Sequence, residues 1–247
     1  MSENNKPRLT ASFANLETAI KIWWKNLKKF VLVYLWALAY AAAPLVIAAV
    51  MLGLLVWLGD GAGAAVYTAI FAVLALCFLA FLYFAIRAYI AIFLVVKHDF
   101  SGNEHEIFKE SAQYFWSYLG VAIPVAIFVL LWSLLLIIPG IIFGVFYSFA
   151  VYIFFFEGKK GLDAISASKR LVSGYWWPVF GRFLFIGIIA IVFSLIITAP
   201  LSAKGVSPES GFYHIWNMLV QIVNYLIGPI YLLYNYQIYR DLVKIKK

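Results

Sequence analysis

Long apolar runs alternate with short polar segments along this chain. A helix needs roughly 20 residues to cross about 30 Å of hydrocarbon. Runs of that kind predict six membrane-spanning helices, over residues 30–58, 65–96, 119–138, 141–156, 179–199 and 215–239. The fold class that we expect is therefore all-α, a polytopic membrane protein with six transmembrane helices.

The third and fourth apolar runs are separated by Pro139 and Gly140, with no charged residue between them. A Pro-Gly pair is a strong turn signal, because proline fixes its own backbone angle and glycine tolerates unusual ones. We expect a tight helical hairpin at this pair. Whether this hairpin crosses the whole bilayer is left open by the pattern.

Three polar segments, each before a predicted span, have a helical period and one apolar side. They begin near Ser12, Asn103 and Gly161, and Trp24, Trp116 and Trp177 mark the same point in each. We therefore expect three amphipathic helices on one side of the membrane. The pattern predicts a single membrane domain over 1–247, with repeat units at about 12–98, 103–156 and 161–240 and polar tails at 1–11 and 241–247.

Two locations in the folded protein are equally compatible with these amphipathic segments. In the first segment Phe13, Leu16, Ile20, Trp23 and Leu27 follow the helical period and the charged residues face away. Such a helix can lie in the headgroup plane, where tryptophan is also favoured. It can instead pack its apolar side against the ends of the spans.

Composition supports lipid as the solvent of this chain. The sequence is 65% hydrophobic and only 12% charged, so a soluble fold of 247 residues could not cover its apolar surface. The net charge of +8 is spread between the apolar runs rather than over a polar domain, which argues against a nucleic-acid partner. The one cysteine, Cys77, allows no disulfide within the chain.

Basic residues gather on one side of the predicted spans. They are Lys6, Arg8, Lys21, Lys25, Lys28, Lys29, Lys97, Lys109, Lys159, Lys160, Lys169, Arg170, Arg182, Arg240, Lys244, Lys246 and Lys247. The opposite side holds only Lys204. Loops rich in lysine and arginine stay in the cytoplasm, so we expect both termini there.

The segment 137–183 carries a set of spaced residues that resembles a known motif. Its members are Pro139, Gly140, Glu157, Gly158, Ala164, Ser168 and Trp177. The arrangement resembles bacterial and archaeal polytopic proteins related to the membrane domain of glycerophosphoryl diester phosphodiesterases. The resemblance implies a prokaryotic cytoplasmic (inner) membrane, and the catalytic acids and histidines of the soluble domain of such enzymes have no counterparts in this sequence.

Two polar features inside the apolar runs are candidates for binding. Arg87 lies within the second span, where a charge costs about 2.5–3.5 kcal/mol on insertion scales. We consider snorkelling or structural pairing for it, and also contact with an anion or lipid. The sixth span has one polar side, which either bonds neighbouring helices or lines a polar cavity; its members are Asn217, Gln221, Asn224, Tyr231 and Asn235.

No constellation typical of an enzyme, metal site or cofactor site stands out, so we expect no catalytic residues and no cofactor. The leading hypothesis is a non-enzymatic membrane module that contacts anionic lipid headgroups through Arg87, Lys159, Lys160, Lys169 and Arg170, or that supports envelope lipid processes. A small transporter or transporter subunit is the alternative. A third hypothesis is a scaffold or regulator of an unidentified membrane partner.

Overall fold

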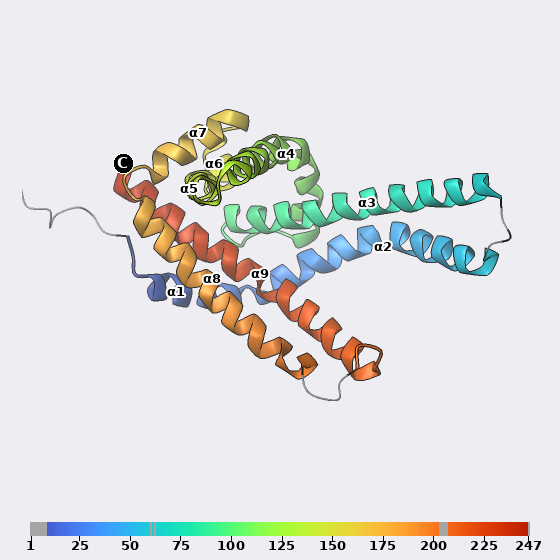
Figure 1. The fold of residues 1–247 in the computed structure, drawn as a ribbon. Helices are drawn as coiled ribbons and strands as arrows, with labels where there is room; N and C mark the ends of the chain where they lie inside the picture. Colours follow the sequence, from blue (N-terminus) through green and yellow to red (C-terminus); the bar gives the residue numbers. More distant parts are fainter. Residues whose placement is uncertain (1–8, 60, 62, 203–206, 247) are drawn as a thin grey trace, which may run out of the picture. The chain divides into compact units, whose positions relative to one another are not determined.

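The computed structural model describes residues 9–59, 61, 63–202 and 207–246, and these residues form helices without any strand (Figure 1). Lys6, Arg8, Lys204 and Lys247 lie outside the described residues. The helices are α1 (Ser12–Lys25), α2 (Leu27–Leu58), α3 (Ala64–Lys97), α4 (Glu104–Leu135), α5 (Ile137–Tyr147), α6 (Ala150–Glu157), α7 (Gly161–Val172), α8 (Trp176–Thr198), the 3₁₀ turn η2 (Ala199–Ser202) and α9 (Gly211–Lys246).

Six stretches of helix among the described residues are long and apolar enough to cross a membrane. They are Leu27–Leu58, Ala64–Lys97, Glu104–Leu134, Ile137–Glu157, Trp176–Leu201 and Gly211–Lys246. The fourth stretch consists of α5 and α6 joined by a two-residue break. The predicted all-α fold with six apolar spans is therefore confirmed, and the chain has the architecture of a multi-pass membrane protein.

The chain forms two compact units. One unit contains residues 28–118, which comprise nearly all of α2, the whole of α3 and the start of α4. Its buried core is the end of α3, from Ile90 to Val96, together with Phe30 and Phe108. The Lys29 ammonium stabilises one edge, because it bonds to Glu104 at 3.2 Å and to the Gly102 carbonyl at 3.0 Å.

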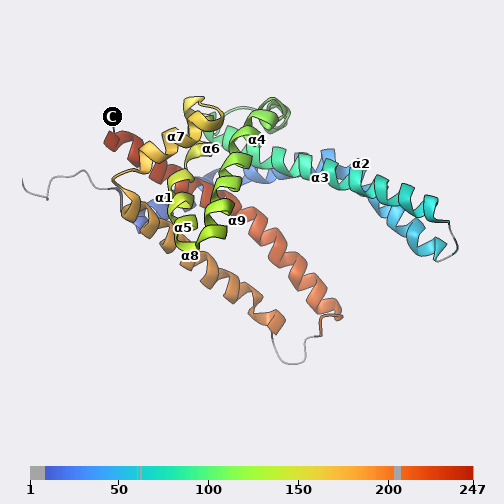
Figure 2. The same ribbon diagram turned by 45° about the horizontal axis from the view of Figure 1, so that its top comes forward.

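The other unit contains residues 9–27 and 119–246. In it α1 packs antiparallel against the C-terminal half of α9. The helices α8 and α9 form a long hairpin (Figure 2). Two hydrogen bonds fix the register of α1 on α9: the Thr10 N–H donates to Asp241 at 3.1 Å and the Trp23 indole donates to the Leu226 carbonyl at 2.8 Å.

The predicted turn at Pro139 and Gly140 was wrong, because both residues lie inside α5. The chain breaks instead at Leu136, which is extended with φ −158° and ψ 139°. Pro139 then falls in the first turn of α5, where a helix has no partner for a backbone N–H, so proline is tolerated. The helical hairpin itself is present between α4 and α5.

Gly140 has a packing function in this hairpin. A Cβ at this position would lie 2.9 Å from the Cα of Ser133 on α4 and would also overlap the Ser133 hydroxyl. Only a residue without a side chain allows the two backbones to approach so closely, as small residues do generally between membrane helices.

The three predicted amphipathic segments do not all form separate helices. Segments one and three are separate short helices, α1 and α7. The segment after Asn103 is instead the first half of α4 and continues without interruption into the third span. The Asn103 side chain accepts a hydrogen bond of 2.8 Å from the His105 N–H, as a helix N-cap does. The threefold repeat stays a prediction.

Candidate functional site

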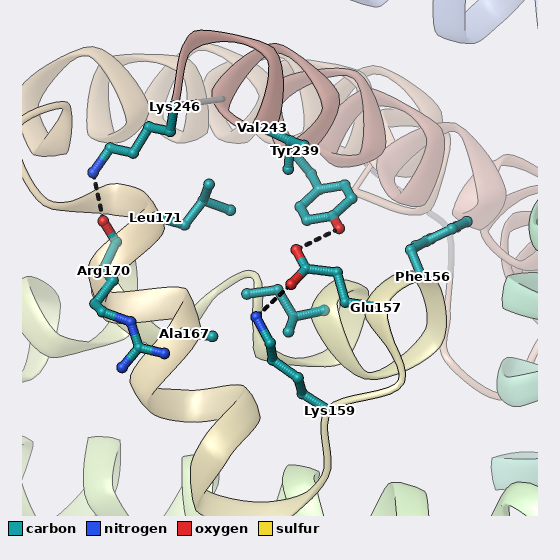
Figure 3. Close-up of a pocket in the computed structure, with 10 residues that line it drawn as sticks. Phe156, Glu157, Lys159, Ala167, Arg170, Leu171, Tyr239, Val243 and Lys246 are labelled. Atoms are coloured by element: carbon teal, nitrogen blue, oxygen red, sulfur yellow. Dashed lines mark hydrogen bonds and ion pairs between the residues drawn. The ribbon is translucent and has the colours of Figure 1, made fainter.

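A pocket of about 630 Å³ opens between α6, α7 and α9 (Figure 3). Its lining residues combine aliphatic and aromatic side chains with four charged ones; they are Ile153, Phe156, Glu157, Lys159, Ala167, Arg170, Leu171, Tyr239, Val243 and Lys246. Three of the charged side chains are cations and one is a carboxylate. A wall that is apolar next to a cationic rim suits a ligand that is itself part apolar and part anionic.

Local sequence explains how α6 and α7 come to lie on either side of this pocket. Gly158 ends α6 in a left-handed conformation with φ 74°, which glycine adopts without steric cost. The chain reverses through Lys159 and Lys160, and Gly161 opens α7 with φ 51°. The short basic turn therefore places Lys159 beside the last residue of α6, Glu157.

Glu157 and Tyr239 connect α6 to α9 at the pocket wall. The Tyr239 hydroxyl donates to one Glu157 carboxylate oxygen at 3.0 Å, and the Lys159 ammonium binds the other at 2.7 Å. Figure 3 shows the tyrosine hydroxyl pointing at the carboxylate. Both oxygens of Glu157 are thus already bonded. The carboxylate therefore fixes the positions of Tyr239 and Lys159, and the positive charge of Lys159 weakens its repulsion of an anion.

Lys246 closes the opposite end of the pocket. Its ammonium donates to the carbonyl oxygens of Arg170 at 2.5 Å and Ser173 at 2.7 Å. A cation at this place stabilises the C-terminal end of α7, where carbonyl groups have no partner within the helix. The Arg170 guanidinium has no hydrogen bond or ion pair with any other described residue.

Of the four basic residues predicted around this turn, two line the pocket and two do not. Lys159 and Arg170 are in the lining. Lys160 precedes the first residue of α7 and is exposed. Lys169 lies over the Phe143 ring, with its ammonium 5.8 Å from the ring centre. Sequence reasoning missed Lys246 as a site residue, because 76 positions separate it from Arg170.

Ser168 bridges the break between α5 and α6. Its hydroxyl accepts a hydrogen bond of 3.1 Å from the Phe149 N–H and donates one of 2.7 Å to the Phe146 carbonyl. The break would otherwise leave these backbone groups unpaired in an apolar surrounding, which costs several kcal/mol in hydrocarbon. Ala164, one turn earlier on α7, is fully buried on the same side.

The apolar side of α7 is buried inside the protein. Its buried residues are Ala164, Ile165, Ala167, Ser168, Leu171 and Val172, and α7 contacts α5, α6 and α9. The amphipathic segments were expected either in the headgroup plane or packed against the spans, and α7 is packed against the spans. Trp177, the last residue of the motif, follows in the first turn of α8 and is 74% exposed.

Arg87 is held by protein groups within its own unit. The residue is 7% exposed, and its guanidinium donates to the Phe108 carbonyl at 2.6 Å and to the Ser111 hydroxyl at 3.1 Å. The ring of Phe108 lies 4.5 Å from the guanidinium carbon. This geometry matches structural pairing between α3 and α4, and Arg87 does not line the pocket.

The predicted polar side of the sixth span does not line the pocket either. On α9, Gln221, Asn224 and Tyr231 are exposed, and Asn217 is half-buried. Asn235 is buried, and its side-chain oxygen has no hydrogen-bond partner among the described residues. The structure therefore does not gather these five residues into one site.

Comparisons with protein-family models, with curated proteins and with solved structures found no match to this chain. Among the described residues, no three His, Cys, Asp or Glu side chains are grouped so that they could hold a metal ion.

Proposed function

We propose that this chain is a non-enzymatic module of a prokaryotic cytoplasmic membrane and that its pocket binds the anionic headgroup of a membrane lipid. The observation that carries the proposal is the Arg170 guanidinium, which has no partner among the described residues and lies at the rim of the pocket. A guanidinium presents a planar set of donors that matches the oxygens of a phosphate.

The rest of the pocket fits a lipid better than a free ion. Phe156, Leu171 and Val243 give it an apolar wall, against which a glycerol backbone and the first acyl carbons can pack. Two of the contributing helices, α6 and α9, belong to membrane-spanning stretches. A headgroup can therefore enter the pocket while its acyl chains stay in the bilayer.

The test is retention of lipid by the purified protein. The double variant Lys159→Gln/Arg170→Gln removes two positive charges from the rim, while Arg240→Gln/Lys244→Gln removes two from exposed positions outside the pocket lining. Anionic lipid that co-purifies in detergent is quantified by mass spectrometry. We expect several-fold less in the rim variant and parental amounts in the control variant.

Equal retention by the parent and both variants would contradict the proposal. Equal loss in both variants would show a general effect of positive charge, and the pocket would then have no special role. Inorganic phosphate added during purification distinguishes binding of a whole lipid from binding of a phosphate group alone. It displaces the lipid only if the headgroup phosphate alone is recognised.

A second candidate function is a small transporter or transporter subunit, and the polar side of α9 favours it. Gln221 and Asn224 are exposed on a membrane-spanning helix, and polar groups in hydrocarbon are stabilised only by a polar partner or water. Cysteines at these two positions test this function through their reaction with a water-soluble maleimide. Absence of reaction in the folded protein would argue against an aqueous path along α9.

A further inference from the structure

Three large apolar side chains protrude from one side of α1. Phe13 is 71% exposed, Ile20 is 43% exposed and Trp24 is 70% exposed. Their spacings of seven and four residues place them on a single face, because an α-helix completes two turns in about seven residues. The sequence pattern had grouped Phe13 and Ile20 with Trp23, but Trp23 turns inward and bonds to α9.

A different side of α1 is fixed to the protein. Asn15 and Ala19 are buried, and α1 contacts α9 and α8. Arg182 of α8 additionally binds the chain just before α1, through the carbonyl oxygens of Leu9 at 3.0 Å and Thr10 at 2.6 Å. The orientation of α1 is thus set by protein contacts, and the face with Phe13, Ile20 and Trp24 is held outward.

The third side of α1 is charged. Glu17 and Lys21 form an exposed ion pair, and Lys25 in the last turn is also exposed. The helix therefore has a protein side, an apolar outer side and a charged outer side. Helices in contact with the surface of a bilayer also combine an apolar side with a charged side, and their basic residues face the phosphates.

The chain continues from α1 into a membrane span with only Asn26 between them, since α2 begins at Leu27. One end of α1 is therefore covalently joined to the start of a stretch that is long and apolar enough to cross a membrane. Trp24 lies at that end, and tryptophan is enriched at the depth of the headgroups.

We propose that the face of α1 with Phe13, Ile20 and Trp24 contacts membrane lipid, among the headgroups and upper acyl carbons, while the helix stays packed against the C-terminal half of α9. Lys21 and Lys25 then meet anionic phosphates at the surface. The partner of this face is lipid, and α7 has no comparable role because its apolar side is buried in the protein. This inference does not depend on lipid binding in the pocket.

Spin labels report this insertion directly. Single cysteines at Phe13, Ile20, Trp24, Glu17 and Lys21 are made in a Cys77→Ser background, labelled and reconstituted into nanodiscs that contain an anionic lipid. Collision rates with oxygen, which concentrates in lipid, are compared with those of a water-soluble nickel chelate. We expect oxygen to dominate at positions 13, 20 and 24, and nickel to dominate at positions 17 and 21.

Two results of the spin-label experiment would overturn the proposal. Nickel rates above oxygen rates at all five positions would place α1 in water. Low rates for both reagents at 13, 20 and 24 would show a face covered by protein. A benzophenone amino acid at Ile20 or at Lys21 gives a second measurement without a label: a lipid adduct is expected at position 20 and in clear excess over position 21, and equal yields would contradict insertion.

Discussion

The Ser168 hydroxyl accepts a hydrogen bond of 3.1 Å from the Phe149 backbone N–H, across the break between α5 and α6. Ser168 lies on α7 and Phe149 lies in the break, directly before α6, and the bond between them is buried. Ser168 therefore completes the backbone hydrogen bonding of a discontinuous span and at the same time attaches α7 to it. Through α7, this bond also helps to position Arg170 at the pocket.

Ser168→Ala removes both hydrogen bonds of this hydroxyl and strands the Phe149 N–H. Leaving a buried donor unpaired costs about 1–3 kcal/mol, so we expect the free energy of unfolding to fall by that amount. It is measured by titration with sodium dodecyl sulfate in mixed micelles. Ser166→Ala is the control, because Ser166 is exposed on the same helix; an equal effect of both variants would contradict the bridging role.

Gly140→Ala should separate α4 from α5, since the added methyl group overlaps Ser133. Overpacking of this kind typically costs about 1–3 kcal/mol, and a lower thermal midpoint is the expected result. Gly144→Ala on the same helix is the matched control, because nothing lies within 4 Å of its added Cβ. If the two alanine variants melt at the same temperature, the close approach at Gly140 has no energetic weight.

Arg87→Leu should lower stability. The guanidinium bonds to Phe108 and Ser111 join α3 to α4, and hydrogen bonds to a charged group contribute about 1.5–3 kcal/mol each. Arg240→Leu removes the same charge from an exposed position of α9 and should melt close to the parent. A variant Arg87→Leu that keeps parental stability but loses stabilisation by anionic lipid would indicate a ligand-binding arginine instead.

Hydropathy alone predicted the six spans, because hydrocarbon demands long apolar helices and few sequences satisfy that by accident. It misplaced the hairpin break, since Pro139-Gly140 reads as a turn while the chain breaks three residues earlier, at Leu136. With the break at Leu136, Gly140 packs closely on Ser133 of α4. That contact is tertiary and leaves no local signal.

Only some residues of the candidate site could be predicted from the sequence. Lys159 and Arg170 could be singled out as basic residues beside a membrane segment, but their convergence with Lys246 depends on how α9 returns to α7. The pairing of Arg87 with Ser111 joins two helices across 24 residues and has no periodic signature. Periodicity identifies faces of helices, whereas it does not say which faces meet.

The orientation of the spans gives a prediction that also bears on the pocket. Single cysteines are introduced at Ser166 and Ser207 in a Cys77→Ala background. Both residues are exposed, and the predicted topology places them on opposite sides of the membrane. Because basic residues gather on the side of Ser166, the positive-inside rule predicts that Ser207→Cys reacts with an impermeant maleimide in intact cells. Ser166→Cys should react only after the membrane is permeabilised.

Ser166 lies on α7, four residues before Arg170, so its labelling also reports the side on which the pocket opens. Reaction only in permeabilised cells places the pocket toward the cytoplasmic leaflet, where anionic lipids produce a surface potential that attracts basic side chains. Ser101→Cys, in the exposed turn between α3 and α4, should behave like Ser166→Cys and serves as an independent control. Labelling of Ser166→Cys and Ser101→Cys in intact cells would reverse the predicted topology and move the pocket to the opposite leaflet.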